Sequence, residues 1–593
     1  MASTSTCLRV STALSTSLIF LSAIFAVSFF FVGKGGAQEA GLDSIYENEN
    51  GTSHGSYYVG NYKAQTGPRK TGPVKARAEG HKMRFTPIYQ ISNSPEEEYL
   101  EQAVVPIALE SLARVFSLVY PTEADALVLP RGCRRTLTWS DGRVECAELF
   151  SEAGTACGRG ELPSELYGAA EVCSGQAPGD CRRTPEGAGA NATDFILVVT
   201  SDGSEPECQS GNDGDLKAQG GFCATDEGTG RPVAGFVNVC PGGISTDVDQ
   251  LGKQVDLVVH EVLHALVMEP SLWSDFRDVE GQPVKTATDP ATGRESRFLS
   301  TPRVTAFVRE HFDCPTLLGA ELEDEGGDGT QWSHFEESLF HGELMTGIAV
   351  GAGRSILSNL TLSLMEDSGW YQPDYSFGGY LSFGEGAGCD FASRKCESDG
   401  AAAEAFFCDQ PGETACTADE LALGRCETNP LANGCSIAKG FGNYQCQDAR
   451  NMEKGLPLQI FDSSSLCVAG DPEPWRMQSR ERREASVMTV TTTYPGASDG
   501  CFAFRCDDGE IFVHLEGREH PCPPGSFIEL GELGLGFTSG RFGPCPGKEV
   551  CEEQLGCNGL CNALQGYCHH GECRCHLGFY GHHCESAVEP RAG

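Results

Sequence analysis

The sequence is poor in basic residues. It has 43 Lys and Arg against 83 Asp and Glu, which gives a formal net charge of −40 at pH 7. Nucleic-acid backbones are bound by clustered Lys and Arg, so this balance argues against a nucleic acid as a partner. The same charge repels the protein from an anionic membrane face.

The sequence also lacks paired CxxC motifs, which argues against a zinc ribbon. It has 29 cysteines instead: Cys7 stands alone near the N-terminus, and the other 28 run from Cys133 to Cys584. An even number at this density is typical of disulfide-bonded proteins in an oxidising compartment. We therefore expect disulfides, and a secreted or cell-surface protein.

Long apolar runs are scarce, and the main one lies at the N-terminus. Residues 10–32 carry no charge, and small residues follow that suit cleavage before Gln38. The pattern predicts a signal peptide over residues 1–37. An uncleaved signal anchor is the alternative, and only that alternative would attach the protein to a membrane. The last residues, CESAVEPRAG, have no apolar tail, which argues against a GPI anchor.

The chain of 593 residues is too long for one ordinary core, so several domains are expected. Residues 38–80 are poor in large apolar side chains and predict a disordered segment or a pro-segment. Strand patterns in MRFTPIYQI, DFILVVTS and GRPVAGFVNVC, with helical patterns between them, predict an α+β fold with a mixed sheet. Beyond residue 389 cysteines dominate, and we expect a loop-rich region held by disulfides.

The last six cysteines have a spacing of their own: Cys557, Cys561, Cys568, Cys573, Cys575 and Cys584. Six cysteines alone leave the pairing open. The close pair CRC, followed by two glycines before the final cysteine, resembles an EGF-like module over residues 556–586. That resemblance implies first-to-third, second-to-fourth and fifth-to-sixth pairing. Four histidines in this segment are expected to be solvent-exposed rather than metal-binding: His569, His570, His582 and His583.

One long helix is predicted by STDVDQLGKQVDLVVHEVLHALVMEP, with Ser245 or Thr246 as its N-cap and Pro270 as its stop. At about 100° per residue its aliphatic side chains share one broad stripe. His260 and His264 lie on the opposite side, about 40° apart, with Glu261 about 60° further round. The two histidines are therefore expected to lie off the core face.

This spacing suits a metal site. Two imidazoles one helical turn apart can bind the same ion, and a neighbouring carboxylate can take a proton from water. The HExxH pattern alone is only a modest signal and needs a third ligand. Two later histidines are candidates, His334 and His341.

Five segments in this order carry a family resemblance: GRPVAGFVNVCP, HEVLHAL, SHFEESLFHGELMTG, LTLSLMEDSGWY and FGEGAGCDF. Together they resemble leishmanolysin-type zinc peptidases of the metzincin group, from about residue 82 to about 555. The resemblance implies a metzincin-like catalytic domain with a mixed twisted sheet and a long active-site helix. It implies one Zn²⁺ per chain, with His260, His264 and His334 as ligands. Glu261 would be the general base and then the general acid.

The same resemblance places Met345 in the turn beneath the metal, although a core-filling role is the commoner one for methionine. His341 is then expected to be a surface residue. The family has glycine where this chain has Val267, so we expect the helix to continue to Pro270 and turn there. The family's latency cysteine is also missing, because no cysteine lies between Cys7 and Cys133. Three sequons are candidates for N-glycosylation: Asn50, Asn191 and Asn359.

The sequence thus predicts a secreted or cell-surface zinc endopeptidase that acts on proteins or peptides. Its catalytic region is expected over residues 81–388, its cysteine-rich C-terminal part over 389–555, and the EGF-like module after that. The module could bind an extracellular protein partner or serve as a spacer. The alternative function is a catalytically inactive adhesion protein that keeps the peptidase fold and binds through the module.

Overall fold

The structure is a computed structural model that describes residues 80–589. The description is interrupted at 122–125, 151–153, 205–207, 209–216, 278, 289–293, 328, 399–400, 455–457, 469–474, 484–485, 495–498, 558–559 and 562–564. The predicted leader 1–37, the sequon at Asn50 and all but the last residue of the segment 38–80 lie outside the described residues. Among the helices that are described, none has the length and apolar character needed to cross a bilayer.

A four-stranded mixed sheet forms the centre of the fold, in the order β1-β11-β13-β12. Its strands are β1 (Phe85–Gln90), β11 (Phe195–Thr200), β13 (Pro232–Val239) and β12 (Ala218–Thr225). The first three are parallel, and β12 is antiparallel to β13. The predicted mixed sheet is therefore present, and the three strand segments predicted from the sequence all belong to it.

The central strand β11 explains how the sheet is covered on both sides. All six of its residues are buried, as expected for a strand packed on both faces. Phe195, Leu197 and Val199 point into the main hydrophobic core, whereas Ile196 and Val198 point into a second cluster. The second cluster lies under the short hairpin of β6 (Gly154–Cys157) and β7 (Gly160–Pro163).

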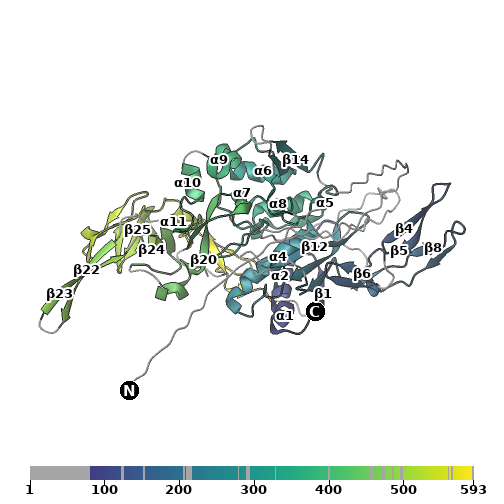
Figure 1. The fold of residues 1–593 in the computed structure, drawn as a ribbon, viewed down its shortest axis with the longest axis horizontal. Helices are drawn as coiled ribbons and strands as arrows, with labels where there is room; N and C mark the ends of the chain where they lie inside the picture. The colour runs from purple at the N-terminus through teal and green to yellow at the C-terminus, as the bar shows by residue number, and fades with distance from the viewer. Residues whose placement is uncertain are drawn as a thin grey trace, which may run out of the picture. The chain divides into compact units, whose positions relative to one another are not determined.

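Two helices cover the main-core face: α2 (Val105–Val115) and α4 (Leu251–Leu266), which lie beside the sheet in Figure 1. A helical stretch made of α1 (Pro95–Tyr99) and a π-helical turn (Leu100–Val104) leads into α2. Close contact between α4 and the sheet requires glycine at two positions. A Cβ on Gly220 would lie 2.2 Å from the Glu261 carbonyl oxygen, and one on Gly235 would lie 2.8 Å from the Ala265 Cβ.

Both predicted ends of the long helix are wrong. The chain enters through a 3₁₀ turn (Val248–Gln250) capped by the Asp247 side chain, so neither Ser245 nor Thr246 is the N-cap. The helix ends at Leu266 rather than continuing to Pro270. Val267 is the C-cap with φ −154° and ψ −35°, and Pro270 begins a separate short helix, α5 (Pro270–Trp273). Val267 therefore has neither the positive φ that favours glycine nor a helical conformation.

Further helices follow along the chain around the main core: α6 (Pro302–His311), α7 (Glu337–Phe340), α8 (Asn359–Asp367), α9 (Gly388–Arg394) and α10 (Ala401–Phe406). A three-stranded sheet lies between α5 and α7 in sequence: β14 (Val284–Thr288), β15 (Glu295–Leu299) and β16 (Ala320–Glu321). The main core continues beyond residue 389, because Phe391, Phe407 and Ile437 are part of it.

The loop-rich expectation for residues 389–555 is wrong, because much of this region pairs as strands. One three-stranded sheet contains β18 (Thr414–Cys416), β19 (Ala422–Thr428) and β20 (Ser436–Gln445). A four-stranded sheet contains β21 (Ser465–Val468), β24 (Gly500–Asp507), β25 (Glu510–Leu515) and β26 (Arg518–Pro521). These last strands supply much of a separate core that includes Phe502, Phe504 and Val513.

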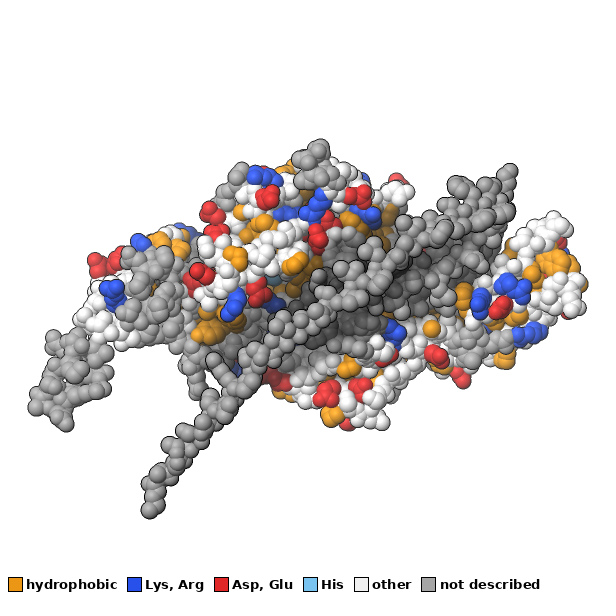
Figure 2. All heavy atoms as spheres, in the orientation of Figure 1, with side chains coloured by type: hydrophobic (Ala, Val, Ile, Leu, Met, Phe, Trp, Pro, Cys, Tyr) orange, Lys and Arg blue, Asp and Glu red, His pale blue; other side chains and the backbone are white. Residues whose placement is uncertain are grey.

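The disulfide expectation is confirmed. All 28 cysteines from Cys133 to Cys584 form disulfides. The last three bonds are Cys557–Cys568, Cys561–Cys573 and Cys575–Cys584, the pairs that the EGF-like resemblance implies. On the face shown in Figure 2, acidic and basic side chains of the described residues are interspersed and form no broad basic surface.

The C-terminal segment packs against the rest of the fold. Its first hairpin joins β30 (Gly566–His569) to β31 (Glu572–Cys575). The Tyr567 hydroxyl accepts a hydrogen bond from the Tyr380 N–H, and the His569 ring stacks on the Tyr380 ring with centroids 4.1 Å apart. His569 is half-buried, so the expectation that all four histidines are exposed is wrong for this one. Val588 belongs to the main core.

A buried ion pair joins this segment to α4. Arg354 donates to both carboxylate oxygens of Asp256 on α4 and also to the Leu577 carbonyl, 3.0 Å away. The side chains of Arg354 and Asp256 are only 6% and 7% exposed. Because the pair is buried, removing one partner leaves an uncompensated charge inside the protein.

We expect Arg354→Ala to lower the free energy of unfolding by about 3–5 kcal/mol, because Asp256 then stays buried without its partner. Arg183→Ala is the matched control, because Arg183 pairs with Glu186 and their side chains are 69% and 65% exposed. That loss should be at most about 1 kcal/mol. Thermal or denaturant unfolding measures both, and equal losses would contradict the burial argument.

Candidate metal centre

Helix α4 carries His260 and His264 one turn apart, and Glu261 between them lies against β12, where a Cβ on Gly220 would be 2.7 Å from the Glu261 Cβ. The one-turn spacing puts the two imidazoles side by side, with ring centroids 4.7 Å apart. All three side chains are nevertheless buried: His260 is 6% exposed, and Glu261 and His264 are 1% exposed. The histidines lie off the aliphatic stripe, as the helical pattern predicts. A second layer, formed by the segment that carries His334, covers them.

That second layer brings in the third imidazole. The His334 Nε2 lies 3.2 Å from the His260 Nε2 and 3.1 Å from the His264 Nε2. The Nε2 atoms of His260 and His264 are 3.0 Å apart. The three nitrogens therefore form a nearly equilateral triangle, built from two elements 70 residues apart in sequence.

His341, the competing candidate, is not part of this triangle. Among the described residues, the cluster of possible ligand atoms contains His260, His264 and His334. The His341 Nδ1 donates instead to the Glu337 carboxylate at 2.6 Å. The expectation of a surface residue is wrong, because the His341 side chain is only 20% exposed. Its carboxylate partner raises the pKa of His341.

Three backbone carbonyls fix the orientation of the three imidazoles. The Nδ1–H of His260 donates to the Leu344 carbonyl at 2.6 Å, and that of His264 to the Met268 carbonyl at 2.8 Å. The Nδ1–H of His334 donates to the Thr330 carbonyl at 3.1 Å. A carbonyl can only accept, so each neutral ring carries its proton on Nδ1. The three Nε2 lone pairs consequently face one another.

Three facing lone pairs are what a cation site requires. Without protons between them the nitrogens repel, whereas one ion at the centre of the triangle is attracted to all three. In a tetrahedral zinc site with bonds of about 2.0–2.1 Å, ligand nitrogens lie about 3.3 Å apart. The observed separations of 3.0–3.2 Å are close to this value. The donor set therefore fits a zinc ion with its remaining position open.

Glu261 lies beside the triangle without a balancing charge of its own. Its Oε1 atom is buried and has no hydrogen-bond partner. Burial raises the pKa of Glu261 to about 8, because the charged carboxylate is poorly solvated there. A cation held by the three imidazoles opposes this shift, since it favours the carboxylate form. The residue after His260 is thus a buried carboxylate with an oxygen that has no hydrogen-bond partner.

The end of α4 takes part in the site. The N–H groups of Val267 and Met268 both donate to the Leu263 carbonyl at 2.9 Å, which turns the chain out of the helix. The turn places the Met268 carbonyl where the His264 Nδ1–H can reach it. The Trp273 indole N–H donates to the Val267 carbonyl at 3.0 Å. The chain thus turns away from the helix without a glycine at 267.

Met345 is completely buried next to the residue whose carbonyl holds His260. Its backbone N–H donates to the Glu343 carboxylate, and its carbonyl accepts from the Phe335 N–H at 3.0 Å. Glu343 is 1% exposed, and burial raises its pKa to about 7 despite the hydrogen bonds that it accepts. The Thr361 hydroxyl donates to it at 2.7 Å. Glu343 therefore anchors the turn that carries Leu344 and Met345.

Sequence reasoning missed Glu343 and the three carbonyl acceptors. Backbone carbonyls leave no side-chain pattern, so no motif identifies them. Glu343 stands in the quoted segment SHFEESLFHGELMTG, and like Glu336 and Glu337 in the same segment it is buried, which the sequence does not indicate. A charged residue within an otherwise apolar turn was the available signal.

Comparisons with known proteins place the chain among peptidases. A family model described as leishmanolysin matches residues 169–433, which contain all three histidines and Glu261. A leishmanolysin-like peptidase of Drosophila pseudoobscura pseudoobscura is 32% identical over 518 residues, 73% of this chain and 74% of the relative. One of Caenorhabditis elegans is 33% identical over 449 residues, 60% of this chain and 65% of the relative. The leishmanolysin of Leishmania donovani is 29% identical over 396 residues, 61% and 62% of the two chains.

The long helix, the cluster of three histidines and the buried glutamate are typical of a metallopeptidase. The chain belongs to the leishmanolysin family. That family consists of zinc metalloendopeptidases, and the chain is an enzyme of this class.

We expect Thr361→Val to lower the free energy of unfolding by about 1–3 kcal/mol, because the buried Glu343 loses a donor. Thr305→Val is the matched control, since the buried Thr305 hydroxyl has no hydrogen-bond partner. That control should be neutral or slightly stabilising. Urea unfolding of both variants tests this, and a Thr361→Val protein as stable as wild type would contradict the role of Glu343.

Proposed function

We propose that the chain is a zinc endopeptidase in which His260, His264 and His334 hold one Zn²⁺ and Glu261 is the catalytic residue. The observation that carries the proposal is the triangle of Nε2 atoms, 3.0–3.2 Å apart, with Glu261 next in sequence to His260. The substrates are proteins or peptides, in keeping with the peptidase family to which the chain belongs.

Bound zinc supplies Lewis-acid chemistry, because it makes water more acidic and polarises a carbonyl group. Glu261 accepts the proton of the attacking water through its carboxylate, which has no competing partner at Oε1. The same carboxyl group then delivers the proton to the nitrogen of the departing amine.

The surrounding chain supports the site in ways that fit a metzincin-like catalytic domain over residues 81–388. The long helix α4 carries two ligands, and the turn with Met345 lies against the His260 ring through the Leu344 carbonyl. We assign Met345 to the turn beneath the metal. Residues 389–555 form the cysteine-rich C-terminal part, and residues 556–586 an EGF-like module whose three disulfides support that assignment.

A secreted or cell-surface location is proposed from the chemistry of the cysteines. Disulfides at this density persist in an oxidising compartment. Asn191 is exposed and is the better glycosylation candidate of the two sequons that the structure describes. Asn359 is half-buried, and its Oδ1 atom is enclosed without a hydrogen-bond partner. The inactive adhesion protein is the weaker alternative, because the three histidines and Glu261 that the chemistry needs are all present in the chain.

We expect about one zinc per chain in wild type, and loss of that zinc in His260→Ala and His334→Ala. His341→Ala is the control, because its imidazole bonds to Glu337 instead of facing the triangle. Metal analysis of the purified, folded variants measures this. Zinc lost from His341→Ala but kept by His334→Ala would overturn the ligand assignment.

We expect Glu261→Gln to keep its zinc and its melting temperature but to lose nearly all cleavage of a generic substrate such as casein. Glutamine has a similar shape but cannot accept the proton, and the loss typical of a general base is about 10²–10⁴-fold. Glu337→Gln is a control glutamate on α7, outside the triangle. Turnover of Glu261→Gln above a tenth of wild type would exclude the general-base role.

A further inference from the structure

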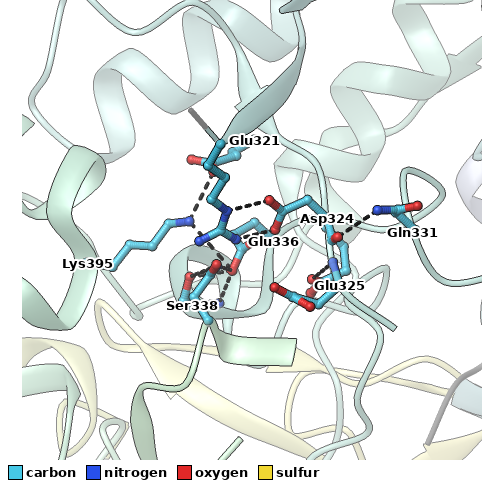
Figure 3. A network of polar contacts seen from close by, with 10 residues as sticks. Glu321, Asp324, Glu325, Gln331, Glu336, Ser338 and Lys395 are labelled. Carbon is cyan, nitrogen blue, oxygen red and sulfur yellow. Dashed lines mark hydrogen bonds and ion pairs between the residues drawn. The ribbon is translucent and has the colours of Figure 1, made fainter. Parts of the chain in front are cut away.

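A second group of carboxylates lies on the loop that carries His334. The loop runs from β16 to α7, and Figure 3 shows Glu321 and Glu336 pointing toward Lys395, with Asp324 close by. Single oxygens from Glu323, Asp324 and Glu336 all lie within 4.8 Å of one another. Oxygens at such distances can be bridged by one ion, since calcium–oxygen bonds measure about 2.3–2.6 Å.

Two of these carboxylates are buried with an oxygen that has no partner. Glu323 and Glu336 are both 0% exposed. The Oε2 atom of each is enclosed and accepts no hydrogen bond, although the Oε1 atoms accept from the Glu325 N–H and from Ser338. Burying an unpaired carboxylate oxygen is costly, and burying two so close together is costlier still because like charges repel.

Among the described residues, two cationic side chains pair with this group, Lys395 and Arg294. Lys395 contacts Glu321 at 3.0 Å and Glu336 at 3.8 Å, and Arg294 pairs with Asp324 through both oxygens. When all four carboxyl groups are ionised, they exceed the two cationic side chains by two negative charges. A divalent cation supplies the missing charge.

We propose that Glu323, Asp324 and Glu336 form a binding site for a hard divalent cation, calcium by the chemistry of its ligands. All three ligands are carboxylate oxygens, which suit calcium and leave no imidazole or thiolate to select a transition metal. The site is separate from the histidine triangle, and it requires no step of the proposed peptide hydrolysis.

The position of the site gives the cation a structural effect on the third histidine. The Glu323 N–H donates to the His334 carbonyl at 3.0 Å, and the Glu323 carbonyl accepts from the Trp332 N–H at 2.7 Å. The chain on either side of Glu323 thus pairs with the segment that carries His334. An ion that fixes Glu323 to Glu336 closes the base of this loop, and it stabilises the folded state by mass action.

The first experiment is a terbium titration of the zinc-loaded protein in the Glu261→Gln background, which avoids self-cleavage. Terbium is a probe for calcium sites, and Trp332 lies in the loop as a donor for sensitised emission. We expect one terbium per chain, displaced by calcium and not by an equal concentration of magnesium. Absence of sensitised emission, or emission that calcium leaves unchanged, would overturn the proposal and favour a proton shared by Glu323 and Glu336.

The second experiment measures the melting temperature with and without millimolar calcium, with zinc kept bound. We expect a rise of about 2 °C or more in the parent protein. Glu323→Gln should abolish the rise. The change leaves the carboxylate partners of the two cations in place, because Arg294 pairs with Asp324 and Lys395 with Glu321 and Glu336.

Glu325→Gln is the matched control. It removes the same charge from an exposed side chain that lies two residues after Glu323 in the sequence. It should keep both the calcium response and the terbium signal. A calcium response that is equal in Glu323→Gln and the parent would assign the effect to surface carboxylates and overturn the proposal. If Glu323→Gln does not fold, the terbium titration of the parent decides. Neither readout is activity, so a failed proposal here is distinguishable from a failed peptidase assignment.

Discussion

Three imidazole lone pairs facing one another across 3.0–3.2 Å are the constraint on which the architecture of the site depends. Such a triangle is repulsive by itself, and it exists because each Nδ1–H is held by a backbone carbonyl. The three carbonyls come from the end of α4, from the loop before His334 and from the turn before Met345. Each element therefore has to be held in place by packing elsewhere.

Packing on the sheet supplies the first of these supports. Gly220 and Gly235 allow α4 to approach the strands so closely that any side chain there would clash with the helix. The aliphatic stripe of α4 is buried in the main core, and His260, Glu261 and His264 lie outside that stripe. A hydrophobic helix buried on all sides has little freedom to shift, which fixes the imidazoles to within small displacements.

Buried charges supply the second support. Several carboxylates are enclosed near the elements that hold the imidazoles. They are Glu343 beneath the Met345 turn, Asp256 beside Arg354, and the pair Glu323 and Glu336. Burial makes each one costly unless it is matched by donors or by a positive charge. Glu343 has its donors and Asp256 has Arg354, whereas Glu323 and Glu336 keep oxygens without a partner. The calcium site inferred above rests on this difference.

The sequence by itself determined the local features. The aliphatic periodicity of the long helix, the alternating strand segments, the even cysteine count and the HExxH pair are properties of neighbouring residues, and short-range geometry is enough to interpret them. The five ordered segments indicate the leishmanolysin family, and that resemblance implies His334 as the third ligand. Helix ends were less accessible: Pro270 was expected to stop the helix, yet the chain turns at Val267, because contacts with Leu263 and Trp273 decide the exit.

Only the tertiary structure decided which distant groups meet. It separated His334 from His341, which lies only seven residues later in the sequence, by turning one ring toward α4 and pairing the other with Glu337. It also revealed that the C-terminal segment packs on the main core through Tyr567 and Val588, and that residues 389–555 are rich in strands. These features depend on burial and on backbone acceptors, which are created by long-range packing and leave no pattern in the order of residues.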